Sequence, residues 1–306
     1  MADSFAVAAA DGVPIVGLVH RPAAGTPRAV VVISAATSVQ SRYYGRFAAY
    51  LADRGFAVVT YDYRGIGLSK PQRLRGFAAG WLDWGRLDLD AVLGHVAAAF
   101  PGRAVAAVGH SIGGFVTGLS PRSGQFTRIV TVGAQFARWR DYHPRHRHRM
   151  LAKWHLAMPL LTRAFGYFPG SRLGWMEDTP AGVVRDWSGF GRGFETSLDR
   201  PDALGSTPRQ ALAAVTAPIL AIGLDDDPFG TVPAIERLLA LYPAAPSTHL
   251  RIDPADIGAA EIGHFAFFHD RFKESLWPIA AAWLEGEPLP EIGRFVAAAD
   301  RPAGRP

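Results

Sequence analysis

The stretch VAAVGHSIGG, residues 105–114, decides the fold. Its first four residues are small and apolar, as in a strand that is buried on both faces. Residues 109–113 then fit the pattern G-x-S-x-G, in which glycines stand two positions before and after a serine. A serine that projects above a sheet edge sits in a strained strand-to-helix turn, and its neighbours must lack a Cβ to avoid the turning chain. The segment therefore predicts a strand, a tight turn that exposes Ser111, and a helix.

A bare G-x-S-x-G match is a weak signal, because any glycine-rich turn between a strand and a helix can produce it. The setting favours a nucleophile, since AVAAV precedes the motif and FVTGL follows it, as a strand–turn–helix element requires. The start of the helix leaves backbone N–H groups unpaired, and these can stabilise negative charge. We expect the N–H of Ile112 to serve as one donor of an oxyanion hole.

The rest of the chain alternates between strand and helix patterns. Asp11-Gly12 is a hairpin signal between two strand-like runs at 5–9 and 14–20. The closing helix is expected to bend at Pro278. Further buried runs lie at 29–34, 56–65, 104–109, 128–134, 217–223 and 247–253, and helical patterns lie at 43–55, 81–100 and 272–284. This alternation predicts an α/β fold with a mostly parallel, eight-stranded sheet and helices on both faces.

Two segments depart from this alternation of strand and helix patterns. Residues 135–208 carry no buried-strand signal and read as a helical insertion between two sheet strands. Residues 286–306 are rich in Pro and Gly and are expected to form a loosely docked or disordered tail. The expected core is therefore residues 1–134 together with 209–285. The insertion is rich in basic and aromatic residues, including Trp139, Trp154, Trp175 and Trp187.

Composition excludes several kinds of chemistry. The chain has no cysteine, which rules out disulfides, thiolate metal sites and a cysteine nucleophile. The formal net charge is +5 and the pI about 9.7, a modest excess that usually serves solubility. No window approaches 18 uninterrupted apolar residues, the length that a membrane-spanning helix requires. Residues 1–14 do not resemble a secretory signal. We therefore expect a cytoplasmic protein without a membrane span.

The basic run RWRDYHPRHRHRM at 138–150 allows three interpretations. A solvated face is the most ordinary one. His143, His146 and His148 can in principle ligate a metal, but no second ligand cluster supports a metal site. Binding of nucleic acid ranks last, because the run is short and contains Asp141 and Pro144. We expect no metal, no organic cofactor and no nucleic-acid partner.

A serine nucleophile needs a base, and the base needs an orienting acid. In enzymes with this serine turn, the acid and then the histidine follow the serine in the chain, each on a loop after a later strand. His264, in EIGHFAFFHD, is the histidine in the loop after the expected last strand, whereas His269 lies near the start of a helix. His264 is therefore the predicted base.

The acid is expected in GLDDDPF, directly after the run at 217–223. Asp225, Asp226 and Asp227 are adjacent there, and an exposed loop at a helix start would look the same. We choose Asp226, with Asp227 second, because sequence alone does not settle a register of one residue.

Over residues 5–285 the chain resembles the α/β-hydrolase superfamily. The matching segments are GHSIGG (109–114), DYRGIGLS (62–69), PILAIGLDDDP (218–228) and GHF (263–265). The combination of YDYRGIG, DWGRLDLDAVL, VGHSIGG, GYFPGSRLGW and IGHFAFF is further similar to a little-characterised bacterial branch of predicted hydrolases. The resemblance implies a shaping role for residues 62–69. It also implies that residues 135–208 are a cap, which covers the serine and shapes the pocket.

The chain departs from many members of the superfamily after the third strand. Those members carry a His-Gly pair there, and the residue beyond it donates the second oxyanion N–H, whereas this chain reads ISAATSVQS at 33–41. The backbone of Ala36 or Thr37 can still donate, since a backbone N–H does not depend on the side chain.

These observations predict a capped serine hydrolase that cleaves a carboxylic ester or a related small acyl compound through an acyl-serine. Two alternatives stay open: an acyltransferase that uses the same Ser111, Asp226 and His264, and a non-catalytic binding protein of the same fold. The aromatic residues of the cap either form its core or line an acyl site, and its arginines either face solvent or receive an acidic substrate. The sequence does not reveal the physiological substrate or the oligomeric state.

Overall fold

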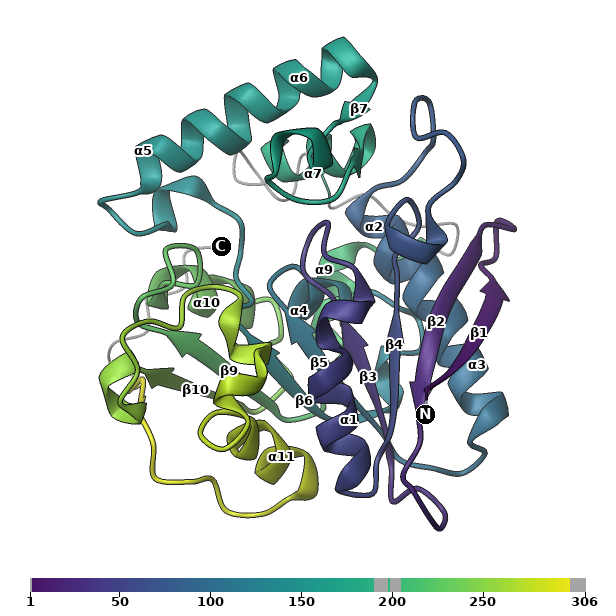
Figure 1. Ribbon diagram of the computed structural model, residues 1–306, viewed down its shortest axis with the longest axis vertical. Coiled ribbons are helices and arrows are strands. Elements are labelled where there is room, and N and C mark those ends of the chain that lie inside the picture. The colour runs from purple at the N-terminus through teal and green to yellow at the C-terminus, as the bar shows by residue number, and fades with distance from the viewer. Residues whose placement is uncertain (1, 190–197, 199–204, 298–306) are drawn as a thin grey trace.

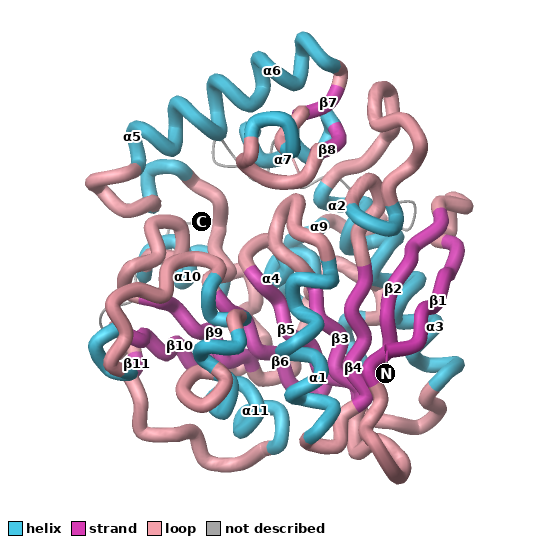
Figure 2. The backbone as a smooth tube through the Cα atoms, in the orientation of Figure 1, coloured by secondary structure: helices cyan, strands magenta, loops and turns pink. Residues whose placement is uncertain are grey.

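A single twisted sheet runs through the molecule in the computed structural model, which describes residues 2–189, 198 and 205–297 (Figures 1 and 2). Its strand order is β1-β2-β4-β3-β5-β6-β9-β10-β11. In this order, the six strands from β4 to β10 are parallel to one another. At the edges, β2 is antiparallel to both β1 and β4, and β11 is antiparallel to β10. The strands are β1 (Ala2–Ala8), β2 (Pro14–His20), β3 (Val30–Ser34), β4 (Ala57–Tyr61), β5 (Val105–His110), β6 (Phe126–Val132), β9 (Ile219–Leu224), β10 (Ser247–Ile252) and β11 (Arg294–Phe295).

The continuous apolar runs of the sequence form the centre of this sheet. Every residue of β3, β4, β5 and β9 is buried. Helices cover both faces, which explains why these strands do not alternate between apolar and polar residues. In Figure 1, α1 (Gly45–Asp53) and α11 (Trp277–Glu285) lie in front of the sheet, and α3 (Asp90–Ala99) and α4 (Gly113–Val116) lie behind it. The predicted α/β class and mostly parallel sheet are confirmed.

The ninth strand comes from the segment that we expected to be a loose tail. β11 pairs with β10 through Leu250 opposite Phe295 and Arg251 opposite Arg294. The carboxylate of Asp225 joins both arginines. The tail therefore docks as far as this strand, and its last residues, 298–306, lie outside the described part of the chain.

The two long helical patterns are divided differently from the prediction. The closing helix begins at Trp277, so Pro278 lies in its first turn, where proline is tolerated, and not at a bend. The pattern at 81–100 forms a short α2 (Trp81–Asp83), π-helical turns over Trp84–Leu89, and α3. No helix in the described part of the chain has both the length and the apolar character needed to cross a bilayer.

The segment between β6 and β9 forms a layer of its own. Figure 1 shows its helices above the ends of the parallel strands. The layer contains α5 (Arg147–Met150), π-helical turns over Leu151–Ala157, α6 (Met158–Phe165), α7 (Ala181–Gly189) and a small hairpin of β7 (Tyr167–Phe168) and β8 (Thr179–Pro180). Helix α9 (Pro208–Ala213) then leads into β9, and α10 (Val232–Leu239) connects β9 with β10. We call residues 135–189 of this layer the helical insertion. The predicted insertion boundaries, 135 and 208, stay a prediction, and part of that range lies outside the described residues.

Candidate active site

Ser111 occupies the strained turn that its motif predicts. Its φ is +54°, in the left-handed region that non-glycine residues seldom adopt, and its N–H donates to Val132 O at 3.0 Å. The flanking glycines leave no room for side chains: a Cβ on Gly109 would lie 2.7 Å from Gly114 N, and one on Gly113 would lie 2.1 Å from Ser34 O. The turn is therefore held between β3 and α4, and it presents Ser111 at the carboxyl end of β5.

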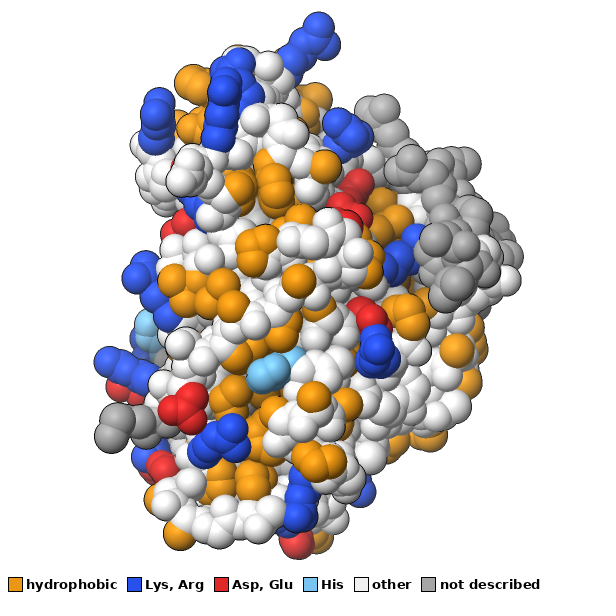
Figure 3. Space-filling view, turned by 90° about the vertical axis from the view of Figure 1, so that its right-hand side faces the viewer, with side chains coloured by type: hydrophobic (Ala, Val, Ile, Leu, Met, Phe, Trp, Pro, Cys, Tyr) orange, Lys and Arg blue, Asp and Glu red, His pale blue; other side chains and the backbone are white. Residues whose placement is uncertain are grey.

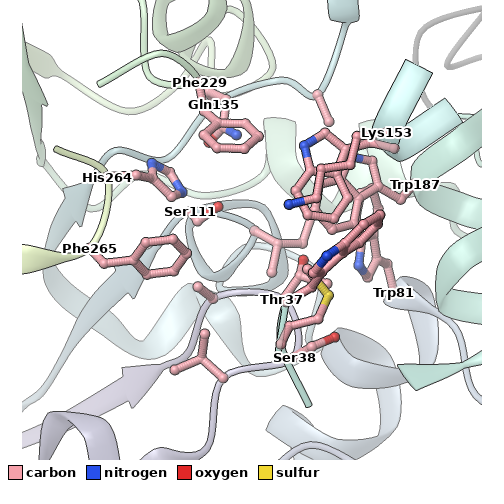
Figure 4. Close-up of a pocket in the computed structure, with 17 residues that line it drawn as sticks. Thr37, Ser38, Trp81, Ser111, Gln135, Lys153, Trp187, Phe229, His264 and Phe265 are labelled. Carbon is pink, nitrogen blue, oxygen red and sulfur yellow. The ribbon is translucent and has the colours of Figure 1, made fainter. Parts of the chain in front are cut away.

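His264 and Asp227 form a buried pair on two neighbouring loops. Asp227 Oδ2 lies 2.6 Å from His264 Nδ1, and Asp227 Oδ1 accepts from Phe229 N at 2.8 Å. Burial by itself raises the pKa of Asp227, but the charge of His264 and the hydrogen bonds that the carboxylate accepts outweigh it, and the net effect lowers the pKa. An ionised Asp227 accepts a hydrogen bond from Nδ1–H, which keeps the proton on Nδ1 and leaves Nε2 as the free basic nitrogen. Figure 4 shows the His264 ring beside Ser111.

The choice of Asp226 as the partner of His264 was wrong by one residue. Asp226 Oδ2 accepts from the backbone N–H groups of Ile262 and Gly263 at 2.7 and 2.9 Å, and so it braces the loop that carries His264. Asp225 lies on a third side, against Arg251 and Arg294. The three adjacent carboxylates therefore point in three directions, which the sequence pattern does not distinguish.

Of the two candidates for a second oxyanion donor, Ala36 and Thr37, the contacts favour Thr37. The N–H of Ala36, our other candidate, donates to Tyr44 Oη at 2.9 Å and is not available to a ligand. Among the described residues, neither Ile112 N nor Thr37 N donates to a protein acceptor. Both residues line the same cavity as Ser111, so two backbone N–H groups without an acceptor in the described part of the chain lie beside the serine.

A buried chain of hydrogen bonds that the sequence analysis missed connects the three loops of the site. Because Tyr44 Oη accepts from Ala36 N, it donates its own proton to His110 Nδ1 at 2.8 Å. His110 Nε2 then donates to His264 O at 2.9 Å. Burial, followed by the charge of His264, lowers the pKa of His110 to about 3, so this histidine stays neutral. The only sequence signal for it is its place beside Ser111.

Gly133 is a second residue that sequence reasoning missed. It follows β6 with φ +54°, and a Cβ there would lie 2.9 Å from Asp227 Oδ2 and 3.2 Å from His264 Nδ1. The chain passes directly against the acid–histidine pair, which leaves room only for glycine. The V-G-A sequence at the end of β6 is the available signal.

A cavity of about 380 Å³ lies between the sheet edge and the helical insertion. Its walls are mainly aromatic and aliphatic, and Trp154 stacks on Trp187 with 4.9 Å between the ring centroids. Trp154, Trp175 and Trp187 of the insertion are thus both packed against one another and exposed to the cavity. The lining residues are Ala36, Thr37, Ser38, Val39, Trp81, Ser111, Ile112, Gln135, Ala137, Lys153, Trp154, Trp175, Met176, Trp187, Phe229, His264 and Phe265.

The loop at 62–69 supports the site without entering the cavity. Asp62 accepts from Ser41 N at 2.6 Å and from Leu68 N at 2.8 Å, which ties the loop to the segment after β3. Arg64 donates to the buried carboxylate of Asp88 at 2.6 Å. These contacts agree with the shaping role that the resemblance implies. As for metals, the described residues contain no group of three or more His, Asp or Glu side chains that could hold an ion.

Comparison with known proteins finds one family-model match and several solved structures of similar fold. Residues 25–173 match the family of serine aminopeptidases, S33, a range that includes Ser111 and ends before Asp227 and His264. The chain has the α/β-hydrolase fold. No curated protein matches it.

Solved structures show the same fold at low sequence identity. A carboxyl esterase from Bacillus coagulans is 13% identical with a TM-score of 0.63, and the match covers 93% of this chain and 98% of the esterase. A monoglyceride lipase from Saccharomyces cerevisiae, in complex with a substrate analogue, is 15% identical with a TM-score of 0.63, over 94% of each chain. DcsB, in complex with its substrate analogue, is 14% identical with a TM-score of 0.61, over 94% of this chain and 100% of DcsB. At such identities these α/β hydrolases share the fold with this chain.

Proposed function

We propose that this α/β hydrolase is a serine esterase that cleaves a carboxylic ester or a related acyl compound through an acyl-serine. The observation that carries the proposal is the convergence on one cavity of Ser111, His264 with its buried partner Asp227, and two backbone N–H groups that have no acceptor among residues 2–189, 198 and 205–297. These are the three parts that acyl transfer needs: a nucleophile, an oriented base, and donors for a developing oxyanion.

In the first half-reaction, Ser111 Oγ attacks the carbonyl carbon of the ester while His264 Nε2 takes the hydroxyl proton. The N–H groups of Ile112 and Thr37 stabilise the negative charge that develops on the carbonyl oxygen, and the loss of one such donor typically lowers the rate about 10²–10³-fold. The tetrahedral intermediate then releases the alcohol, which receives its proton from His264. Asp227 holds the imidazole in the required tautomer and stabilises the imidazolium.

In the second half-reaction, water attacks the acyl-serine. His264 takes a proton from the water, the oxyanion forms again in the same hole, and the proton returns to Ser111 Oγ as the acid leaves. The helical insertion acts as a cap in this proposal, because its aromatic residues close the cavity over Ser111 and limit the entry of water. A cytoplasmic location stays an expectation from the sequence.

The test is covalent labelling with a fluorophosphonate, read as intact mass on the wild type and on Ser111→Ala. We expect one adduct on the wild type and none on the variant, followed by hydrolysis of 4-nitrophenyl esters that Ser111→Ala abolishes. A folded wild type that takes no adduct and cleaves no ester would contradict the proposal. Transfer of the acyl group to an added alcohol in preference to water would identify an acyltransferase instead.

A further inference from the structure

Lys153 is a charged group in the cavity that the proposed mechanism does not use. It belongs to the π-helical turns over Leu151–Ala157 of the helical insertion, and its side chain reaches into the cavity that Ser111 lines (Figure 4). Short π-helical segments often occur at functional sites, where they aim a side chain out of the regular helical pattern.

Two tryptophans hold the Lys153 ammonium in place. Nζ lies 4.3 Å from the ring centroid of Trp154 and 4.2 Å from that of Trp175. Each is a favourable cation–π distance, and the two rings come from different segments of the insertion. The long lysine side chain is therefore positioned before any ligand arrives, so binding to it loses little side-chain entropy.

This ammonium lacks an anionic partner within the described part of the chain. Lys153 takes part in none of the recorded ion pairs there, and none of the described residues that line the cavity is Asp or Glu. Burial, followed by the charge of Arg149, lowers the pKa of Lys153, so the ammonium is destabilised where it stands. A bound anion would remove that penalty. The buried amide oxygen of Gln135, which has no hydrogen-bond partner among the described residues, adds a second unused polar group to the wall.

We propose that Lys153 binds an anionic group of the substrate, and that the enzyme therefore prefers an ester that also carries a carboxylate over its neutral counterpart. The geometry that supports this is a cation without an anionic partner among the described residues, held between Trp154 and Trp175 in a mainly apolar cavity that Ser111 also lines. This inference rests on the proposed function for the presence of the ester group. The apolar walls pack against the carbon chain between the ester and the carboxylate.

The test uses half-esters of straight-chain dicarboxylic acids with six to nine carbons, each as the 4-nitrophenyl ester with a free terminal carboxylate. The neutral comparison is the same 4-nitrophenyl ester with that carboxylate methylated. Binding is measured by calorimetry on Ser111→Ala, and hydrolysis on the wild type. We expect at least one half-ester to bind about 10–100-fold more tightly than its methylated counterpart, the effect of a charged hydrogen bond, and the preference to shrink with added salt.

Variants at position 153 separate charge from packing. In the Ser111→Ala background, Lys153→Met should remove the preference for the carboxylate and leave the affinity for the methylated ester within about threefold. Lys153→Arg should retain the preference, since it keeps a cation over the two rings. Lys273→Met is the matched control, because Lys273 is exposed and lies outside the cavity.

Three results would overturn the inference: equal affinity for both esters, equal weakening of both by Lys153→Met, or no binding of any half-ester to folded Ser111→Ala. Tight binding of the half-esters without hydrolysis by the wild type would have a different meaning. It would refute the proposed esterase function and leave the anion-binding role of Lys153 in place.

Discussion

Single residues in the site make different contacts although their sequence environments are nearly the same. Asp226 and Asp227 are neighbours in a run of three aspartates, yet only Asp227 contacts the imidazole of His264. A strand end followed by a turn directs successive side chains to different sides, so a one-residue register decides which carboxylate meets the histidine.

Because only one of the two aspartates contacts His264, we expect the same substitution to have unequal effects at positions 226 and 227. Asp227→Asn should lower kcat for a 4-nitrophenyl ester by about 10⁴-fold, because the amide favours the wrong imidazole tautomer. Asp226→Asn removes a negative charge from two backbone N–H groups and should lower kcat far less, by about tenfold or less, while lowering Tm. A larger loss of kcat in Asp226→Asn than in Asp227→Asn would contradict the assignment.

His110 predicts a pH dependence of stability. Its pKa falls from 6.5 in the unfolded chain to about 3 in the fold, so between these values the unfolded state binds the additional proton. The free energy of unfolding should therefore decrease as the pH falls below 6.5, with a contribution of about 1.4 kcal/mol per pH unit from this residue.

His110→Gln provides the comparison, because glutamine carries a polar amide that does not titrate. Denaturant titrations of the wild type and the variant between pH 7.5 and 5 should give a shallower loss of stability in the variant. Parallel pH profiles of the two proteins would contradict the neutral state of His110.

At the scale of elements, the serine turn depends on the contact between α4 and β3. Gly113→Ala places a Cβ 2.1 Å from Ser34 O, so the start of α4 must move away from the strand. We expect a loss of about 1–3 kcal/mol of stability, typical of overpacking, together with slower fluorophosphonate labelling of Ser111. Urea unfolding and intact mass over time measure the two effects.

Gly94→Ala is the matched control for this substitution. Gly94 lies in α3, and a Cβ there meets nothing within 4 Å. Replacing a helical glycine by alanine in open space should stabilise the protein by about 0.5–1 kcal/mol and leave labelling unchanged. Equal behaviour of the two variants would mean that the tight approach of α4 to β3 has no effect on the site.

At the scale of the whole molecule, the helical insertion is tied to the loop that carries Thr37. Ser38 Oγ lies 2.5 Å from Thr179 Oγ1, and Gln40 Nε2 donates to Glu177 Oε1 at 2.6 Å. Ser38 itself has φ +58°, so the loop holds a strained residue at the point of contact. The insertion thus helps to position the expected second oxyanion donor.

Thr179→Val tests this connection, because it leaves the buried Ser38 hydroxyl without that partner. We expect a loss of about 1–3 kcal/mol of stability and a lower kcat for ester hydrolysis at little changed KM. Thr26→Val, at an exposed position, should alter neither quantity. A Thr179→Val enzyme that retains the wild-type kcat would show that the contact between Ser38 and Thr179 does not position Thr37 N.

The sequence by itself determined the sheet, the serine turn and the histidine, because each depends on local patterns. Continuous apolar runs specify strands buried on both faces, and glycines two positions either side of Ser111 permit the strained turn. Chain order after the last long strand predicted His264, and the structure places its Nδ1 2.6 Å from Asp227 Oδ2. The edge strand β11 lacked such a pattern, since it is two residues long and is held by Asp225 through Arg251 and Arg294.

Only the tertiary structure decided which groups meet across distant segments. It brought Asp227 to His264, engaged Ala36 N with Tyr44, left Thr37 N without an acceptor among the described residues, and placed His110 and Gly133 against the pair. The physical reason is that hydrogen bonds between loops depend on register and direction within an ångström, whereas the hydrophobic pattern that specifies the strands depends only on which residues are apolar.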